Sequence, residues 1–113
     1  MAKRTDVLKG TLDLLILHAL APGPQHGYGI VQWIRGTTGD VLQVEDGALY
    51  PALHRLEDRG WIFADWGVSD NNRRAKYYRL SAEGRRRLAA ETETWERFSG
   101  AVRSVIRASQ GSS

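Results

Sequence analysis

The chain has 113 residues, of which 42% are hydrophobic and 26% are charged, a composition typical of one folded domain with at most one additional element. It contains no cysteine, which excludes a disulfide framework, a thiolate nucleophile and a cysteine-based zinc site. The longest uninterrupted apolar run, residues 14–17, is far too short to span a bilayer. We therefore expect a soluble, cytoplasmic protein.

The net charge is only +3, but the basic residues are concentrated between positions 73 and 87. This window holds seven arginines and lysines and a single acid, Glu83, whereas the remainder of the chain has more acidic than basic residues. A local basic patch attracts polyanions, and nucleic acid first among them. On charge alone, a merely solvated basic surface is an equally good interpretation.

Two helices are predicted in the first third of the chain. Residues Thr11–Ala21 are apolar almost all round, which indicates a helix buried on more than one side. After the break at "PGPQ", residues 26–39 predict a second helix with His26 placed to cap its start. Its inner face is expected to comprise Tyr28, Ile30, Val31 and Ile34.

The segment Glu45–Gly60, "EDGALYPALHRLEDRG", predicts a third, amphipathic helix, with Leu49, Leu53 and Leu56 facing inward. Pro51 lies inside it, where proline removes a backbone hydrogen bond and costs roughly 3 kcal/mol in a helix interior. If the helix begins near Asp46, only the bond to the carbonyl of Gly47 is lost. We hypothesise that Pro51 stiffens and slightly bends this end of the helix.

Two aromatic and β-branched runs, "WIFADW" and "AKYYRL", predict a β-hairpin over residues 61–80, with "GVSDNNRR" as its loop. Alternation places Ile62, Ala64 and Trp66 on one face, opposite Tyr78 and Leu80. The polar side chains expected at or near the tip are Asn71, Asn72, Arg73, Arg74 and Lys76.

A last helix is predicted from the N-cap Ser81 to about Ala108, roughly 40 Å long, followed by a disordered tail at 109–113. Its apolar seam comprises Leu88, Trp95, Phe98, Val102 and Val105. Residues 1–80 cannot readily cover so long a stripe. Pairing with the same helix of a second copy is the simplest way to bury it.

The order of three helices, a hairpin and a helix is typical of a mainly α fold with a small β-hairpin, the winged helix-turn-helix, over residues 1–80. The segment 81–108 is then a long C-terminal dimerisation helix. In this fold the third helix enters the DNA major groove, and the hairpin wing reaches phosphates or the adjacent minor groove.

Four motifs, "LKGTLDLLILHAL", "HGYGIVQWI", "EDGALYPALHRLEDRGWI" and "NNRRAKYYRLSAEGRRRL", together resemble the PadR family of bacterial transcriptional regulators in its short form. The resemblance covers about residues 7–107. It implies a homodimeric protein that binds specific DNA sequences, usually a repressor on a palindromic operator. A small aromatic effector is the candidate for releasing the protein from DNA. Similar proteins respond to phenolic acids or to planar cationic compounds, and others have no known effector.

The resemblance also implies site residues. From the recognition helix these are Gly47, Ala48, Tyr50, Pro51, His54 and Arg55, and from the wing Asn72, Arg73, Arg74 and Lys76. The expected dimer interface comprises Leu12, Leu15, Leu88, Trp95, Phe98, Val102 and Val105. Two roles of Trp95 stay open. It is either a residue of the dimer seam, which helical spacing favours, or one wall of an effector pocket.

The second helix leaves further choices open. Tyr28 packs inward or touches a phosphate, and packing is favoured. Gly29 and Trp33 depart from the family's commonest pattern, which leaves backbone contacts from this helix open.

No catalytic constellation, dinucleotide-binding loop or metal-ligand spacing is present, so we expect neither an enzyme nor a cofactor nor a metal site. His18, His26 and His54 are better explained by packing, capping or a DNA contact. The alternative function is a winged-helix protein-interaction module without specific DNA binding, whose last helix pairs with a different protein.

Overall fold

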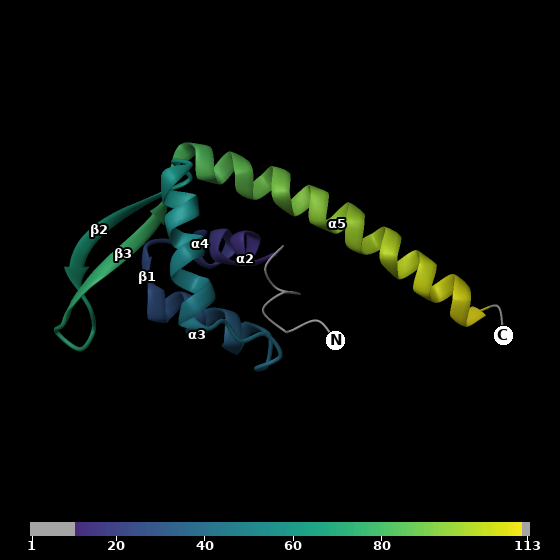
Figure 1. The fold of residues 1–113 in the computed structure, drawn as a ribbon, viewed down its shortest axis with the longest axis horizontal. Coiled ribbons are helices and arrows are strands. Elements are labelled where there is room, and N and C mark those ends of the chain that lie inside the picture. The colour runs from purple at the N-terminus through teal and green to yellow at the C-terminus, as the bar shows by residue number, and fades with distance from the viewer. Residues whose placement is uncertain (1–10, 112–113) are drawn as a thin grey trace.

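The computed structural model describes residues 11–111, and the first ten residues of the predicted domain lie outside this range. Three short helices pack beside a small sheet, and one long helix leaves them to extend away from the body (Figure 1). In chain order the elements are α2 (Leu12–Leu20), β1 (Gln25–His26), α3 (Gly27–Thr37), α4 (Asp46–Asp58), β2 (Ile62–Val68), β3 (Arg74–Leu80) and α5 (Ala82–Gly111). The predicted fold class, a winged helix-turn-helix with a long C-terminal helix, is confirmed.

The core lies where α2, α3 and α4 meet the base of the sheet. The predicted inward face of α4 is confirmed, because Leu49, Leu53 and Leu56 are all fully buried. The side chains that complete the core belong to α2, α3, the link before α4 and the strands: Leu12, Ile16, Leu17, Leu20, Ile30, Ile34, Val44, Trp61, Ile62, Tyr78 and Leu80. This packing holds α4 against the body along one side and leaves its opposite side exposed.

The sheet has three antiparallel strands in the order β1-β3-β2. Ile62 pairs with Leu80 and Ala64 with Tyr78, which is the pairing that alternation predicts. β1 is an addition to the predicted hairpin, since a strand of two residues is too short to show a periodic pattern. Trp66, in the outer half of β2, is exposed.

The hairpin ends in a shorter loop than predicted, because β2 continues to Val68 and β3 already begins at Arg74. The Asn72 amide donates to the Ser69 carbonyl over 2.8 Å, and the Ser69 amide donates to the Arg73 carbonyl over 2.7 Å. Asn72 adopts the left-handed conformation with φ 60°, which asparagine tolerates better than most residues. Two neighbouring arginines follow it, Arg73 in the loop and Arg74 at the start of β3.

Both predicted helix caps are confirmed. His26 Nδ1 accepts a hydrogen bond of 3.0 Å from the Gly29 amide at the start of α3. Ser81 Oγ accepts one of 2.9 Å from the Gly84 amide at the start of α5. Each bond satisfies an amide that the first turn of a helix leaves without a partner.

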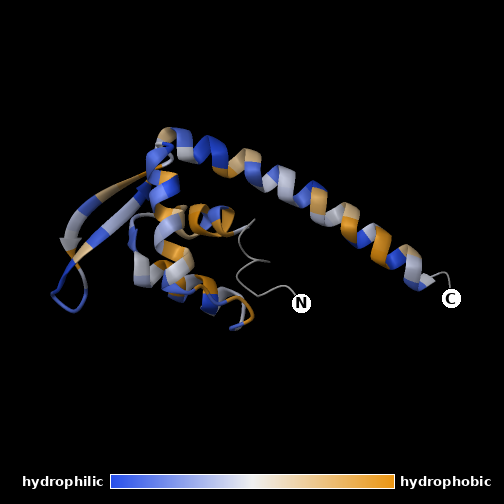
Figure 2. Cartoon of the chain, in the orientation of Figure 1, coloured by the Kyte–Doolittle hydropathy of each residue, from blue (hydrophilic) through white to orange (hydrophobic). Residues whose placement is uncertain are grey.

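Within residues 11–111, the contacts that attach helix α5 to the body lie along its first half. Leu88 packs against the core, and His18 Nε2 of α2 lies 2.8 Å from Thr92 Oγ1. Beyond this contact the helix extends away, with hydrophobic bands exposed along it (Figure 2). The radius of gyration is accordingly 16.1 Å, compared with about 13 Å for a compact domain of this length.

Three predictions need correction. The helix continues to Gly111, so residues 109–111 are not a disordered tail; the chain has no proline there, and the Ser109 hydroxyl donates to the Ile106 carbonyl over 2.9 Å. Residues 112–113 lie outside the described range. Tyr28 is 67% exposed instead of packed inward, because the turn of α3 brings Gly27 and Ile30 to the core.

The third correction concerns Leu12, which we expected at the dimer interface. Its side chain is only 3% exposed and lies in the core of its own chain. It therefore has almost no surface left to bury against a second copy. Leu15, three residues later on α2, is only partly buried against the core and keeps some accessible surface.

Candidate nucleic-acid interface

The exposed side of α4 carries five of the six residues that were predicted to reach DNA from this helix. Gly47, Tyr50, Pro51 and His54 are exposed, and Ala48 is half-buried at the edge of this side. They share one side because the buried leucines at spacings of three and four residues occupy the other. Gly47 and Ala48 add little bulk at the N-terminal end of α4, so a partner surface can approach the backbone closely there.

Arg55, the sixth residue of α4 predicted to contact DNA, is partly buried and forms an ion pair with α2. Its Nη2 donates to Asp13 Oδ1 of α2 over 2.9 Å. Arg59, one turn later on α4, places its Nη1 3.6 Å from Asp13 Oδ2. The guanidinium of Arg55 thus ties α4 to α2, and because its side chain stays partly exposed, its predicted DNA contact stays a prediction.

The wing presents its cations without neutralising partners. Within residues 11–111, neither Arg73, Arg74 nor Lys76 forms an ion pair with an acidic side chain. Arg79, further along β3, does pair with Asp65, at 3.4 Å. The positive charge of the wing is therefore concentrated at its outer half, close to the tip.

Aromatic rings support two of these cations. The Arg74 guanidinium lies 4.8 Å from the ring centre of Trp66, and the Lys76 ammonium lies 5.9 Å from that of Tyr78. Such cation–π contacts restrict the long side chains without neutralising their charge. The charges of Arg74 and Lys76 remain available to an anion.

A hollow of about 600 Å³ separates the wing from the N-terminal ends of α3 and α4. Tyr50 of α4 lines it together with Arg73, Arg74 and Lys76, so the fold brings one predicted residue of the helix and three of the wing to one groove. The groove also includes residues that sequence reasoning did not assign to it, among them His26, Tyr28, Gln32, Trp66 and Tyr78. We refer to this hollow as the wing groove.

Glycine at position 27 helps to shape the wing groove. A Cβ atom there would lie 3.2 Å from the Tyr50 hydroxyl, closer than side chains normally approach. Tyr50 can therefore lie across the start of α3. Burial, with smaller effects from Glu57 and Tyr50, raises the pKa of the neighbouring Tyr78 phenol above its ordinary value.

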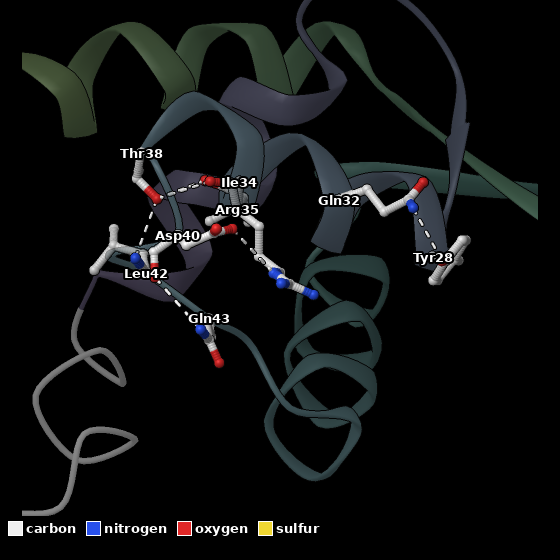
Figure 3. A network of polar contacts seen from close by, with 8 residues as sticks. All are labelled: Tyr28, Gln32, Ile34, Arg35, Thr38, Asp40, Leu42 and Gln43. Atoms are coloured by element: carbon white, nitrogen blue, oxygen red, sulfur yellow. Dashed lines mark hydrogen bonds and ion pairs between the residues drawn. The ribbon is translucent and has the colours of Figure 1, made fainter.

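The outer side of α3 adds polar groups next to the wing groove (Figure 3). Gln32 Nε2 donates to the Tyr28 hydroxyl over 2.9 Å, one helical turn away. Their spacing of four residues, on the side opposite Ile30 and Ile34, is the sequence signal that could have placed them there. A tyrosine hydroxyl and an amide are both suited to hydrogen bonding with phosphate oxygens.

The link between α3 and α4 is held by its own hydrogen bonds (Figure 3). The Thr38 hydroxyl donates to the Ile34 carbonyl over 2.9 Å and accepts from the Leu42 amide over 3.1 Å. Arg35 Nε lies 3.5 Å from Asp40 Oδ1. These contacts fix the turn that sets α4 relative to α3.

Comparison with known proteins decides the family. The model of the transcriptional regulator PadR-like family matches residues 16–90, more than half of the chain. The chain belongs to the PadR family. Members of this family are transcriptional regulators that bind DNA, so the chain is a DNA-binding regulator and not an enzyme.

Individual relatives agree with this assignment. The chain is 36% identical over 93 residues to an uncharacterised protein from Lysinibacillus sphaericus, covering 81% of this chain and 84% of that protein. It is 31% identical to the transcriptional regulator Rv3488 of Mycobacterium tuberculosis, covering 83% and 84%. A solved structure of a transcriptional regulator from Clostridium thermocellum superimposes with a TM-score of 0.79 at 32% identity, covering 88% of this chain and 96% of that one.

Residues 11–111 contain neither a membrane-spanning helix nor a cluster of metal ligands. Although α5 has 30 residues, charged side chains interrupt it, and neither it nor another described helix combines the length and apolarity needed to cross a membrane. In the same range, no three histidine, aspartate or glutamate side chains are grouped as ligands for a metal ion.

Proposed function

We propose that this PadR-family protein is a homodimeric repressor that binds a palindromic operator in the cytoplasm, with one α4 helix in each of two successive major grooves. The observation that carries this proposal is the wing groove, where Tyr50 of α4 lies on one side of a hollow and three cations with no acidic partner among residues 11–111 lie on the other. A DNA backbone running along this hollow would meet positive charge from the wing while α4 enters the adjacent major groove.

Each part of the interface has a distinct task in this proposal. Gly47 and Ala48 allow the N-terminal end of α4 to approach the bases, and Tyr50 and His54 reach base edges or the flanking backbone. Arg73, Arg74 and Lys76 neutralise phosphates, with Asn72 beside them at the tip. Tyr28 and Gln32 donate hydrogen bonds to phosphate oxygens from α3.

Dimerisation is proposed to bury the apolar stripe of α5. Trp95 is 41% and Val102 42% exposed, and Phe98, Val105 and Ile106 are more exposed still. Large apolar side chains in a continuous row on a helix gain free energy when another surface covers them. Twofold symmetry provides the same row on a second copy as a self-complementary partner. In this proposal Leu15 lies at the edge of the interface, and Leu88 is already packed on the core of its own chain.

We also propose where an effector would bind. The Trp95 and Phe98 rings lie 6.1 Å apart with an angle of 41° between their planes, both on the exposed stripe. In the proposed dimer, indoles from the two copies would border one central pocket. A small, flat aromatic compound would stack there and shift the angle between the subunits.

The experiment that tests this function starts with selection of the genomic DNA fragments that the purified protein binds, followed by footprinting. We expect two protected half-sites related by a twofold axis, about one helical turn apart. Affinity should fall steeply with salt, with a log–log slope of about −0.9 for each neutralised phosphate. Equal affinity for random DNA would contradict the proposal.

A separate prediction concerns Pro51, the sixth residue of α4. Pro51→Ala restores an amide that can donate to the Gly47 carbonyl, so the free energy of unfolding in urea should stay equal or rise, by at most about 3 kcal/mol. The affinity for the operator should nevertheless change, because the end of α4 that approaches DNA loses its bend. Operator binding identical to that of the unaltered protein would argue against this role.

A further inference from the structure

The end of α4 and the beginning of α5 meet at two residues, Gly60 and Trp61. Helix α4 closes with a Schellman motif, in which Gly60 has φ 75°, its amide donates to the Glu57 carbonyl over 2.9 Å, and the Trp61 amide donates to the Leu56 carbonyl over 3.0 Å. Gly60 and Trp61 are therefore fixed to the last turn of the recognition helix.

The first turn of α5 is bonded to the same two residues. The Ser81 hydroxyl donates to the Gly60 carbonyl over 2.6 Å, and the Ser81 amide donates to the Trp61 carbonyl over 3.0 Å. Gly84 is buried against this carbonyl, and a Cβ atom at position 84 would overlap the Trp61 oxygen. Because that oxygen belongs to the backbone, a larger residue could be accommodated only if α5 shifted.

Trp61 also joins the two helices through its ring. The indole is 8% exposed and lies between the Arg59 guanidinium of the α4 terminus, at 5.1 Å, and the Arg87 guanidinium of α5, at 4.8 Å. We call Gly60, Trp61, Ser81, Gly84 and Arg87 the α4–α5 joint. Its contacts come from both helices, so a rotation of one relative to the other breaks several of them at once.

Helix α2 braces the joint from a second side. Asp13 bonds to Arg55 and lies close to Arg59, which connects α2 to α4. His18 reaches Thr92 of α5; since the Thr92 hydroxyl already donates to the Leu88 carbonyl, the His18 Nε2–H is the donor of this bond. The three helices are thus connected pairwise, which fixes the angle between α4 and α5.

We propose that Gly84, Trp61 and Arg87 are positioning residues that set the distance between the two half-sites that the protein recognises. This inference rests on the proposed dimer, in which α5 pairs with its copy and each α4 is held at the angle of the joint. Helix α4 has 13 residues and is about 20 Å long. A change of about 10° at the joint would move its far end by about 3.5 Å, close to the rise of one base pair, about 3.4 Å.

The test measures the affinity for a series of operators whose half-site spacing is changed by single base pairs. For Gly84→Ala we expect the optimum to move by at least one base pair, with a loss of about tenfold at the original spacing. The mass in sedimentation and the salt dependence should stay unchanged, because neither the α5 stripe nor the wing is altered. An equal loss at every spacing would overturn the inference, since it would indicate general destabilisation.

A milder variant keeps the test decisive if Gly84→Ala does not fold. Arg87→Ala removes one side of the Trp61 contact, and we expect the ratio of affinities at the best and next-best spacings to fall at least threefold. The matched control is Arg86→Ala, which makes the same charge change at an exposed position paired with Glu83. Equal ratios for the two variants would overturn the inference.

The two proposals fail in different ways. A monomeric unaltered protein, or one indifferent to half-site spacing, would contradict the proposed dimeric repressor and the inference with it. A dimer with a clear optimum that both Gly84→Ala and Arg87→Ala leave in place would contradict the role of the joint alone.

Discussion

Replacing Arg73 and Arg74 together with alanine is expected to lower the affinity for every DNA sequence by about a hundredfold near physiological salt. Both side chains are exposed beside the wing groove and have no acidic partner within residues 11–111. A hydrogen bond between ionic groups contributes about 1.5 kcal/mol or more, which is about tenfold for each residue. Titrations at several salt concentrations should show the log–log slope becoming less steep by about 2.

The pattern across sequences separates phosphate contacts from base contacts. The double variant should keep the ranking of operator variants, whereas changes at Ala48 or His54 should alter it. Arg85→Ala with Arg86→Ala is the matched control, because it removes the same charge at the start of α5, away from the wing groove. If this control weakened binding as much, net charge rather than the wing would be responsible.

Val102→Asp is expected to abolish the dimer and to reduce operator affinity by at least about a hundredfold. In the proposed interface the substitution would bring two carboxylates together in an apolar seam, and burying unpaired charge costs several kcal/mol. Each protomer would then bind a half-site independently and lose the gain from linking two sites. Sedimentation velocity should give the mass of one chain, 12.7 kDa.

Ser104→Asp is the matched control for this prediction. It introduces the same side chain two residues further along α5, on the side away from the apolar stripe. We expect it to remain dimeric and to bind with nearly unchanged affinity. A Val102→Asp protein that kept the dimer mass would contradict the assignment of this stripe as the interface.

The sequence by itself determined the elements and much of their orientation. The spacing of Leu49, Leu53 and Leu56 predicted the buried side of α4, and alternation predicted the pairing of Ile62 with Leu80. These features depend on neighbours within a few residues, where helical and strand periodicity act directly. The caps at His26 and Ser81 were predictable for the same reason.

The tertiary structure alone decided which side chains are engaged by distant parts of the chain. Arg55 bonds to Asp13, 42 positions earlier in the chain, which ties it to α2, and no local pattern indicated this contact. Tyr28 is exposed because Gly27 and Ile30 are the residues that α3 buries in the core of the domain at this turn.

The wing groove and the α4–α5 joint likewise exist only in the folded chain. Gly84 carries no visible signal in the sequence, and its importance comes from the carbonyl of Trp61, which folding brings against it. Contacts of this kind join residues far apart in the chain, where local periodicity holds no information and packing decides the partner.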